Sequence, residues 1–410
     1  MNESTIHWQI LSSLAQSFGL LLSKPSDQPE QQAWRFLKGK AKDMANSDPI
    51  TVYIGTYTRR ESFVDGKAAG IYVYHLNPNS GELTYAATVS GPGTLNPSFL
   101  TLSPDKKYVY AVNEITGGKG PNGTINAFAV DAATGGLRYL NQQSTHGLAP
   151  CYASVEPEGR YCLVANYETG SVCVLPIQPD GSLGEATDTV QFSGSGPNPD
   201  RQEGPHAHMI LPGTDHKFIL AVDLGADRLM SFRLDLERGT LIPNAIPWMQ
   251  LPPGTGPRHL VFHPHWPFAY VISELQSTIT VLRHDDQQGA FEASQIISTL
   301  PAAFKGQNLG AEIKVAPSGR FVYASNRGHN SLAIYAVEQE TGRLSLIGHE
   351  STQGVGPRDF NIDPSGRLLL VANQDTDTVV TFWIDQATGM LRATGQAAAV
   401  PTPVCLQLVN

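Results

Sequence analysis

The sequence predicts an all-β protein, a seven-bladed β-propeller that carries a short N-terminal helical extension. The chain repeats itself at intervals of about fifty residues, which is the range expected for propeller blades. Its 39 glycines and 29 prolines are spread along 410 residues, as expected for many short strands joined by turns. With 41% hydrophobic and 16% charged residues, the chain is able to bury a large core.

The helical extension covers residues 1–47, before the first repeat. Apolar residues at helical spacing predict an amphipathic helix over residues 4–22, and a second short helix is expected over residues 31–44. The residues that carry this spacing are Leu11, Leu14, Phe18 and Leu22. No basic residue precedes the apolar stretch, so we do not expect a signal peptide. The sequence leaves open whether translation starts at Met1 or at Met44.

Most repeats open with two prolines seven positions apart that enclose a β-type run. The copies with both prolines begin at Pro97, Pro150, Pro205, Pro257 and Pro357. In a further copy Gly310 takes the place of the first proline, ahead of Pro317. We expect this run to be the strand that lines the central channel of the propeller.

A second strand, rich in Val, Tyr and Ala, follows in every repeat, and a polar turn that closes on glycine comes later. The strand begins at Thr51, Tyr108, Tyr161, Phe218, Phe268, Phe321 and Leu368. Turns such as NSGEL, ATGGL and ETGRL predict hairpins between two outer strands. Each repeat is therefore predicted to be a four-stranded antiparallel meander.

The first repeat has no proline-led strand of its own. The run 403–409, at the C-terminal end of the sequence, supplies the missing strand. We therefore expect one propeller domain over residues 48–410, closed by the last strand so that no inner edge stays unpaired.

The charge balance narrows the choice of partners. A net charge of −9 argues against nucleic acid and against a membrane surface, because both bind through a basic face. Small molecules are the expected partners, and the sequence leaves the oligomeric state open. The four cysteines show no CxxC spacing, which predicts reduced, buried thiols and a cytoplasmic location.

The repeats also predict where polar groups meet. The first strand starts, and the second strand ends, at the same rim of the channel. The residue after the leading position of the first strand differs from blade to blade. In blades two to seven, and then in the C-terminal strand that completes blade one, it is Ser98, Cys151, His206, Arg258, Ala311, Arg358 and Val404. The last residue of the second strand is Tyr57, Glu114, Tyr167, Leu224, Glu274, Arg327 or Gln374. Blades four to seven carry most of the chargeable groups, so the predicted site lies on one side of the channel mouth.

Three arginines directed at one cavity of an acidic protein indicate a site for an anion. They are Arg258, Arg327 and Arg358, and Asn326 and Asn373 are expected beside them as further substrate-binding residues. The alternative is that these arginines form structural ion pairs between blades.

His206 and His208 form an H-x-H pair on one face of a strand. A metal site would need a third ligand, and Glu274 lies one blade away among arginines, so no metal is expected. His206 within reach of Glu274 suits proton transfer instead. His208 either lines the channel as a structural histidine or joins the substrate-binding residues.

Other chemistries find little support in the sequence. There is no G-x-S-x-G elbow, and Ser98 has no histidine at the neighbouring rim positions. Cys151 is a conceivable nucleophile without an evident base beside it. Neither a phosphate-binding loop nor a dinucleotide-binding glycine motif is present.

Several strings of the sequence resemble one known family. They are GPHAHMI at residue 204, GPRHLVFHP at 256, VISEL at 271, FVYASNRGHNSLAIY at 321 and GPRDFNIDPSGRLLLVANQDTDTVV at 356. They resemble the bacterial propeller family of 6-phosphogluconolactonases, which is similar in fold to the fungal 3-carboxy-cis,cis-muconate lactonizing enzyme. The resemblance runs from about Ile50 to the C-terminus and leaves out the extension.

The resemblance implies hydrolysis of 6-phosphogluconolactone to 6-phosphogluconate, in the pentose phosphate pathway, without a metal or an organic cofactor. It implies a catalytic set of His206, Arg258, Glu274 and Arg327, in which Glu274 or His206 takes a proton from water and Arg258 or Arg327 stabilises the oxyanion. Because fold alone does not fix function, two alternatives stay open. One is a lactonizing or other lactone-opening activity on a carboxylated substrate, and the other is a non-catalytic propeller that binds a partner.

Overall fold

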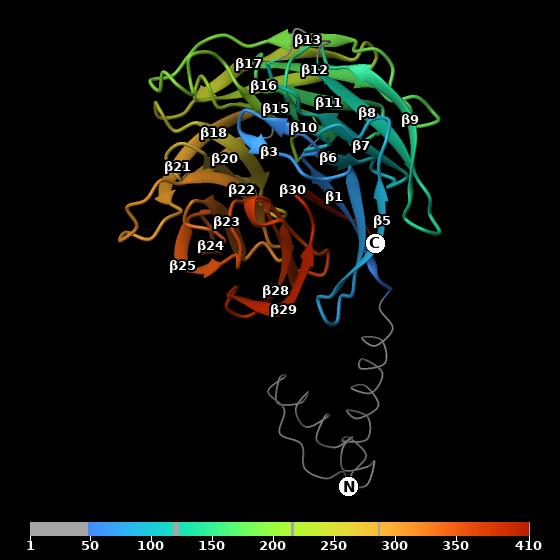
Figure 1. Ribbon diagram of the computed structural model, residues 1–410. Coiled ribbons are helices and arrows are strands. Elements are labelled where there is room, and N and C mark those ends of the chain that lie inside the picture. The colour runs from blue at the N-terminus through green and yellow to red at the C-terminus, as the bar shows by residue number, and fades with distance from the viewer. Residues whose placement is uncertain (1–47, 118–122, 215–216, 286–287, 410) are drawn as a thin grey trace, which may run out of the picture. The chain divides into compact units, whose positions relative to one another are not determined.

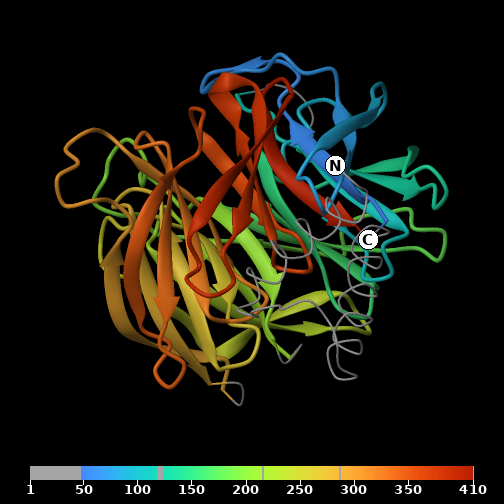
Figure 2. The ribbon, with the colours of Figure 1, turned by 90° about the horizontal axis from the view of Figure 1, so that it is seen from below.

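The computed structural model describes residues 48–117, 123–214, 217–285 and 288–409. These residues form seven four-stranded antiparallel sheets arranged around a central axis, which Figure 1 and the view from below in Figure 2 show. A two-stranded hairpin of β2 (Arg60–Glu61) and β3 (Val64–Asp65) is inserted in the first blade. Within these ranges the one helical element is η1 (Gln374–Thr376). The predicted seven-bladed propeller is confirmed.

The strands of each blade follow one another from the channel outward. Blades one to three comprise β30 (Pro403–Val409), β1 (Ile50–Thr56), β4 (Ile71–Leu76) and β5 (Leu83–Val89), then β6 (Leu100–Leu102), β7 (Tyr108–Asn113), β8 (Thr124–Val130) and β9 (Leu137–Ser144), then β10 (Pro150–Val155), β11 (Tyr161–Asn166), β12 (Ser171–Pro176) and β13 (Asp188–Gln191). Blades four and five comprise β14 (Ala207–Pro212), β15 (Ile219–Asp223), β16 (Arg228–Asp235) and β17 (Thr240–Gln250), then β18 (Pro257–Phe262), β19 (Phe268–Ser273), β20 (Thr278–Asp285) and β21 (Ala290–Ser298). Blades six and seven comprise β22 (Leu309–Val315), β23 (Phe321–Arg327), β24 (Ser331–Val337) and β25 (Leu344–Ser351), then β26 (Pro357–Ile362), β27 (Leu368–Asn373), β28 (Thr378–Ile384) and β29 (Leu391–Ala399).

The last strand closes the ring, as predicted. β30 pairs antiparallel with β1, from Thr51 opposite Val409 to Gly55 opposite Cys405. The seam is also sealed by apolar packing, because Leu370 of blade seven belongs to the same buried cluster as residues of blade one. Burial of this apolar surface is the dominant force that holds neighbouring blades together.

The glycine that closes each outer hairpin joins that blade to the one before it. Gly342 of blade six packs on Phe268 of blade five, and a Cβ at this glycine would lie 2.4 Å from the ring. Its φ of 70° also favours glycine. The carbonyl of Gly342 accepts a hydrogen bond from Tyr270 Oη at 3.1 Å. The repeated glycine in the sequence is thus required by contact between blades.

The strand register of blade four differs from the sequence prediction. Ala207 pairs with Asp223, just as Pro257 pairs with Ser273 in blade five. The structural counterpart of the leading proline is therefore Ala207, and Pro205 lies two positions too early. The repeat pattern was misleading here because the prolines of this blade keep the spacing of seven while both lie two residues upstream.

This shift exchanges the places of the two histidines of blade four. His208 occupies the position that Arg258 holds in blade five, and His206 lies in the segment that precedes β14. The side chain of Asp223 holds this segment in place, because its Oδ1 accepts the backbone N–H of His206 at 2.8 Å. The prediction that His206 is the repeat equivalent of Arg258 is wrong for this reason.

One outer strand, in blade three, and one inner strand, in blade two, also depart from the predicted pattern. In blade three the polar turn leads only to an isolated bridge between Ile177 and Leu183, and the outer strand β13 begins at Asp188. In blade two the inner strand begins at Leu100 instead of Pro97. The helices expected over residues 4–22 and 31–44 lie outside the described residues.

Candidate active site

A β-bulge shapes the start of most inner strands. The ladder of blades three, five and seven skips one residue, and the skipped residues are Cys151, Arg258 and Arg358. A bulge breaks the alternation of side chains and redirects the residue at the break. It therefore explains why the residue after the leading proline reaches the channel mouth.

Glu274 lies at the centre of three arginines, each from a different segment. It directly follows β19, and its carboxylate contacts Arg258 Nε at 3.2 Å and Arg327 Nη2 at 2.6 Å. Arg201, from the loop between β13 and β14, binds the other carboxylate oxygen. The structure thus brings together three of the four residues that the family resemblance implied, and adds one that the sequence analysis missed.

This arrangement fixes the charge of Glu274. Burial alone would raise the pKa of the carboxyl, but the charges of Arg327, Arg201 and Arg258 outweigh burial and hold the pKa below its usual range. The carboxylate therefore stays ionised, and its oxygens are already engaged by guanidinium groups. Such a group orients arginines well but is a weak proton acceptor.

His206 lies beside this cluster and has its own set of partners. Its ring stacks on Tyr167, with centroids 4.6 Å apart. Nδ1 lies 3.0 Å from the carbonyl oxygen of Tyr167, which can only accept, so Nδ1 carries a proton. Nε2 lies 3.1 Å from a carboxylate oxygen of Glu203, whose side chain is 59% exposed. Tyr167 links His206 to the arginines, because its hydroxyl accepts a hydrogen bond from Arg201 at 3.2 Å.

Arg358 forms the other side of the mouth and is held loosely. Its Nη2 lies 3.6 Å from Glu114 Oε1, and its guanidinium lies 5.4 Å from the ring centre of Tyr57. Tyr57 Oη donates to the second oxygen of Glu114 at 2.7 Å. A guanidinium carries five N–H donors, so Arg358 keeps most of them available for a ligand.

The structure places Asn326 and Asn373 away from these groups, which corrects the expectation that they bind substrate. Both side chains are fully buried. Asn326 Nδ2 donates to the carbonyl of Thr299, and Asn373 Nδ2 donates to the carbonyl of Thr352. Asn166 makes the same bond in blade three, so this asparagine is a recurring tie between the second strand of one blade and the end of the preceding blade.

His208 lies in the channel below the mouth. Its Nδ1 is 3.8 Å from Cys151 Sγ, so the cysteine does have a histidine beside it, contrary to the sequence analysis. Burial, helped by the charge of Arg258, holds the pKa of His208 well below its usual value. Burial also raises the pKa of the Cys151 thiol. At neutral pH the pair is therefore a neutral imidazole and a thiol, which does not suit nucleophilic attack.

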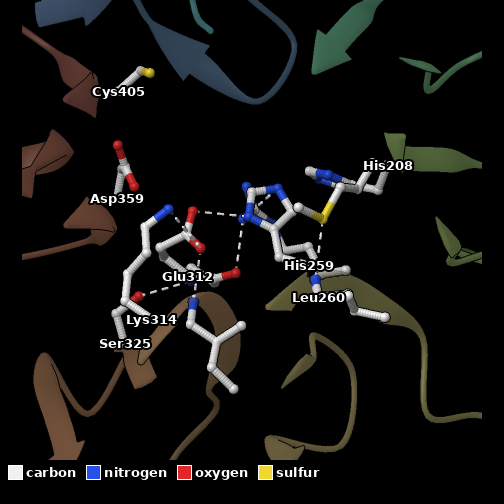
Figure 3. A network of polar contacts seen from close by, with 12 residues as sticks. His208, His259, Leu260, Glu312, Lys314, Ser325, Asp359 and Cys405 are labelled. Carbon is white, nitrogen blue, oxygen red and sulfur yellow. Dashed lines mark hydrogen bonds and ion pairs between the residues drawn. The ribbon is translucent and has the colours of Figure 1, made fainter. Parts of the chain in front are cut away.

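A second tier of polar residues lines the channel under the arginines, and the sequence analysis missed it. Figure 3 shows His259, Glu312, Lys314 and Asp359 of this tier. A small pocket reaches from Arg258 to this tier and has room for about one water molecule.

The mouth holds more positive than negative charge. Among the residues that the structure describes, the four arginines Arg201, Arg258, Arg327 and Arg358 contact two buried carboxylates, those of Glu114 and Glu274. The surplus of guanidinium groups suits an anionic ligand. In the described part of the chain, no group of three or more His, Cys, Asp or Glu side chains is arranged to hold a metal ion.

Fold and site together define a propeller protein with an arginine-rich site at one end of its channel, next to a histidine. The chain belongs to the seven-bladed β-propeller lactonase family: the family model described as "Lactonase, 7-bladed beta-propeller" matches residues 51–408.

Named relatives agree with this assignment. The chain is 35% identical over 358 residues to a protein of Bacillus subtilis named 6-phosphogluconolactonase, with 87% of this chain and 98% of that one covered. It is 33% identical over 308 residues to a protein of the same name from Formosa agariphila, with coverages of 74% and 85%. The solved structure of a periplasmic gluconolactonase from Pseudomonas aeruginosa matches with a TM-score of 0.82 at 33% identity, and covers 88% of this chain and 99% of its own. No helix among residues 48–117, 123–214, 217–285 and 288–409 is long and apolar enough to span a membrane.

Proposed function

We propose that this protein hydrolyses 6-phosphogluconolactone to 6-phosphogluconate, the reaction named for its relatives from B. subtilis and F. agariphila. The observation that carries the proposal is the surplus of arginine at the channel mouth, since both the substrate and its product are anions. The reaction needs only a water molecule, a proton acceptor and a group that stabilises an oxyanion.

His206 is the proton acceptor in this mechanism. Nδ1 donates to the carbonyl of Tyr167, and Nε2 faces the carboxylate of Glu203, which also only accepts. Nε2 becomes a proton acceptor once the exposed side chain of Glu203 moves aside and the Nε2 proton passes to solvent. Water attacks the lactone carbonyl carbon as His206 takes one of its protons, and a tetrahedral oxyanion forms. The ring C–O bond then breaks, and the histidine returns the proton to the departing ring oxygen, which becomes a hydroxyl.

We assign the stabilisation of the oxyanion to Arg258 and Arg327. Arg327 Nε is buried and, within the described residues, has no hydrogen-bond acceptor. Glu274 holds the two guanidinium groups in place through Arg258 Nε and Arg327 Nη2, which leaves other N–H donors of each group for the oxyanion. Donors that are fixed before the reaction stabilise developing charge at little reorganisation cost.

Arg358 is placed to bind the phosphate. Arg358 belongs to blade seven, across the mouth from Tyr167 and Glu203, which are the partners of His206. Its one ion pair within the described residues is a long contact to Glu114. A guanidinium can bind two phosphate oxygens at once, which would distinguish the phosphorylated lactone from the free one.

One experiment tests the proposal. Purified protein is assayed with freshly prepared 6-phosphogluconolactone and with unphosphorylated gluconolactone, before and after prolonged treatment with a chelator. We expect a kcat/KM at least tenfold higher for the phosphorylated lactone, and no loss of turnover after chelation. Equal or higher kcat/KM for gluconolactone would favour the second candidate, the reaction named for the P. aeruginosa relative. Activity that disappears with the chelator and returns with a divalent ion would contradict a metal-independent mechanism.

The compartment is part of the proposal. The four cysteines are unpaired and buried, which is compatible with the reducing cytoplasm that the sequence predicts. We propose a cytoplasmic enzyme on this ground. Its expected partner is the small anionic lactone, and the expectation that it binds neither nucleic acid nor membranes stays a prediction from its charge.

A further inference from the structure

A buried chain of hydrogen bonds connects the channel interior to Arg258. His259 Nδ1 lies 2.8 Å from Glu312 Oε2, and His259 Nε2 lies 3.4 Å from Arg258 Nη1. All three side chains are buried. Figure 3 shows the imidazole of His259 on β18 facing the carboxylate of Glu312 on β22, the inner strand of the next blade.

The carboxylate fixes the tautomer of the histidine. An ionised carboxylate only accepts hydrogen bonds, so His259 Nδ1 carries the proton and donates it to Glu312. Nε2 is then left with a lone pair that accepts from Arg258 Nη1. Burial, together with the charge of Arg258, lowers the pKa of His259 to about 4, which keeps the ring neutral near pH 7.

Glu312 is itself held in one orientation. Its Oε1 accepts the backbone N–H of Ile313 at 2.8 Å and lies 3.5 Å from Lys314 Nζ. Burial alone would raise the pKa of Glu312, but Lys314 and His259 outweigh burial and hold the pKa below its usual range. The two donors at Oε1 orient the carboxylate so that Oε2 faces His259 Nδ1.

We propose that His259 and Glu312 are positioning residues that orient the guanidinium of Arg258 through the fixed tautomer of His259. The inference rests on the proposed role of Arg258 in stabilising the oxyanion. Neither residue needs to touch the substrate, because Arg258 lies between them and the mouth: it contacts His259 on one side and Glu274 on the other. A tautomer held by a carboxylate is the arrangement that orients histidines at many active sites.

Replacement of Glu312 by glutamine is the sharpest variant. The donors Ile313 N–H and Lys314 Nζ keep the amide oxygen at the place of Oε1, so the NH₂ group faces His259 Nδ1. His259 must then carry its proton on Nε2, where it opposes an N–H of Arg258. We expect Glu312→Gln to lower kcat at least tenfold with KM changed less than threefold.

A double-mutant cycle separates positioning from a general structural role. In the Arg258→Met background, Glu312→Gln should change kcat less than twofold, since the group that it orients is gone. A purely structural effect would multiply with that of Arg258→Met. Glu156→Gln is the matched control, because Glu156 is equally buried but binds backbone N–H groups of the turn after β10. We expect this control to keep the wild-type kcat.

Two further measurements keep the inference testable if Glu312→Gln does not fold. Nitrogen NMR of labelled histidine should show the Nδ1–H tautomer of His259 in the wild type, and observation of Nε2–H would overturn the inference without any assay. His259→Gln should retain more kcat than His259→Asn, because only the longer amide can place an acceptor near the position of Nε2. A wild-type kcat in Glu312→Gln, beside a strong loss in Arg258→Met, would refute the positioning role alone. A wild-type kcat in Arg258→Met would refute the proposed mechanism itself.

Discussion

Arg327 Nη2 lies 2.6 Å from Glu274 Oε2, and the two residues stand at matching positions, at the ends of the second strands of adjacent blades. The ion pair therefore joins blade five to blade six at the channel mouth. It follows that the arginines of the site are held by the same contact that holds the blades in register, so structural and functional effects of Glu274 are coupled.

Replacement of Glu274 by glutamine should therefore affect stability and turnover together. Three guanidinium groups would lose their common anion, and removal of one partner from a buried ion cluster costs about 3–5 kcal/mol. We expect a fall in melting temperature of at least 5 °C, measured by calorimetry, and a lower kcat. Glu203→Gln, at an exposed carboxylate, should leave the melting temperature unchanged. A normal melting temperature with a low kcat in Glu274→Gln would instead support a general base at this position.

His206→Ala should act on the chemical step. Loss of the proton acceptor is expected to lower kcat by roughly 10²-fold or more, with little change in KM. Circular dichroism should stay close to that of the wild type, because Asp223 holds the backbone of residue 206. The melting temperature should fall, because the stacking on Tyr167 and the hydrogen bond to its carbonyl are lost. A kcat within threefold of the wild type would exclude His206 as the base.

Arg358→Ala should separate the two lactones. Loss of a charge-assisted contact costs about 1.5–3 kcal/mol, so KM for 6-phosphogluconolactone should rise roughly 10- to 100-fold. KM for unphosphorylated gluconolactone should change little. Arg228→Ala, on the outer strands of blade four against Trp248, is a control that should leave both constants unaltered. An equal effect of Arg358→Ala on both lactones would show that Arg358 does not bind the phosphate.

Stability should decrease as the pH falls from about 6.5 towards 4. Burial lowers the pKa of His259 to about 4 and holds that of His208 well below its usual value, whereas both take up protons near pH 6.5 once unfolded. In this window the unfolded state binds more protons, so each histidine lowers the free energy of unfolding by about 1.4 kcal/mol per pH unit. Asp359 acts in the opposite sense, because burial and the charge of Glu312 raise its pKa.

Urea unfolding at pH 7.5, 5.5 and 4.5 measures this slope. A shallower slope is expected for His259→Gln, which has no group that titrates at this position. An equal slope in the wild type and in His259→Gln would show that the pKa of His259 is not lowered in the folded protein.

Removal of residues 403–410 should open the propeller. Blade one would lose β30, and β1 would present an unpaired edge at the channel. We expect aggregation or a melting temperature lower by more than 10 °C, checked by size-exclusion chromatography and calorimetry. A truncated chain that stays monodisperse with the wild-type melting temperature would contradict the closure of the ring by β30.

The repeats of the sequence allowed the blades, their closure and the rim position of Arg258, Glu274 and Arg327 to be predicted, because blade contacts impose glycines and prolines at fixed intervals. Arg201 could not be found in this way, since it lies in a loop outside the repeat. His259 was hidden for a different reason. Side chains alternate along a regular strand, so the neighbour of Arg258 is expected to point away from the channel. The bulge at Arg258 breaks this alternation, and both residues reach the channel.

The sequence also misplaced the histidines of blade four. Pro205 and Pro212 keep the spacing of the other blades, and only strand pairing shows that both lie two residues upstream of their counterparts. Asn326 and Asn373 were taken for ligand-binding residues because they precede rim positions, although a buried tie recurs at this place.

Closure by the final strand has a consequence for how the protein is made. Arg358 of blade seven contacts Glu114 of blade two across blade one, whose innermost strand, β30, is translated after all the other strands of the propeller. A nascent chain that has reached residue 402 already contains every arginine of the mouth, yet it lacks the wall between them. The strand β30 must therefore leave the ribosome before the site exists, and a stop codon directly after residue 402 would yield a chain with all the site residues and no assembled site.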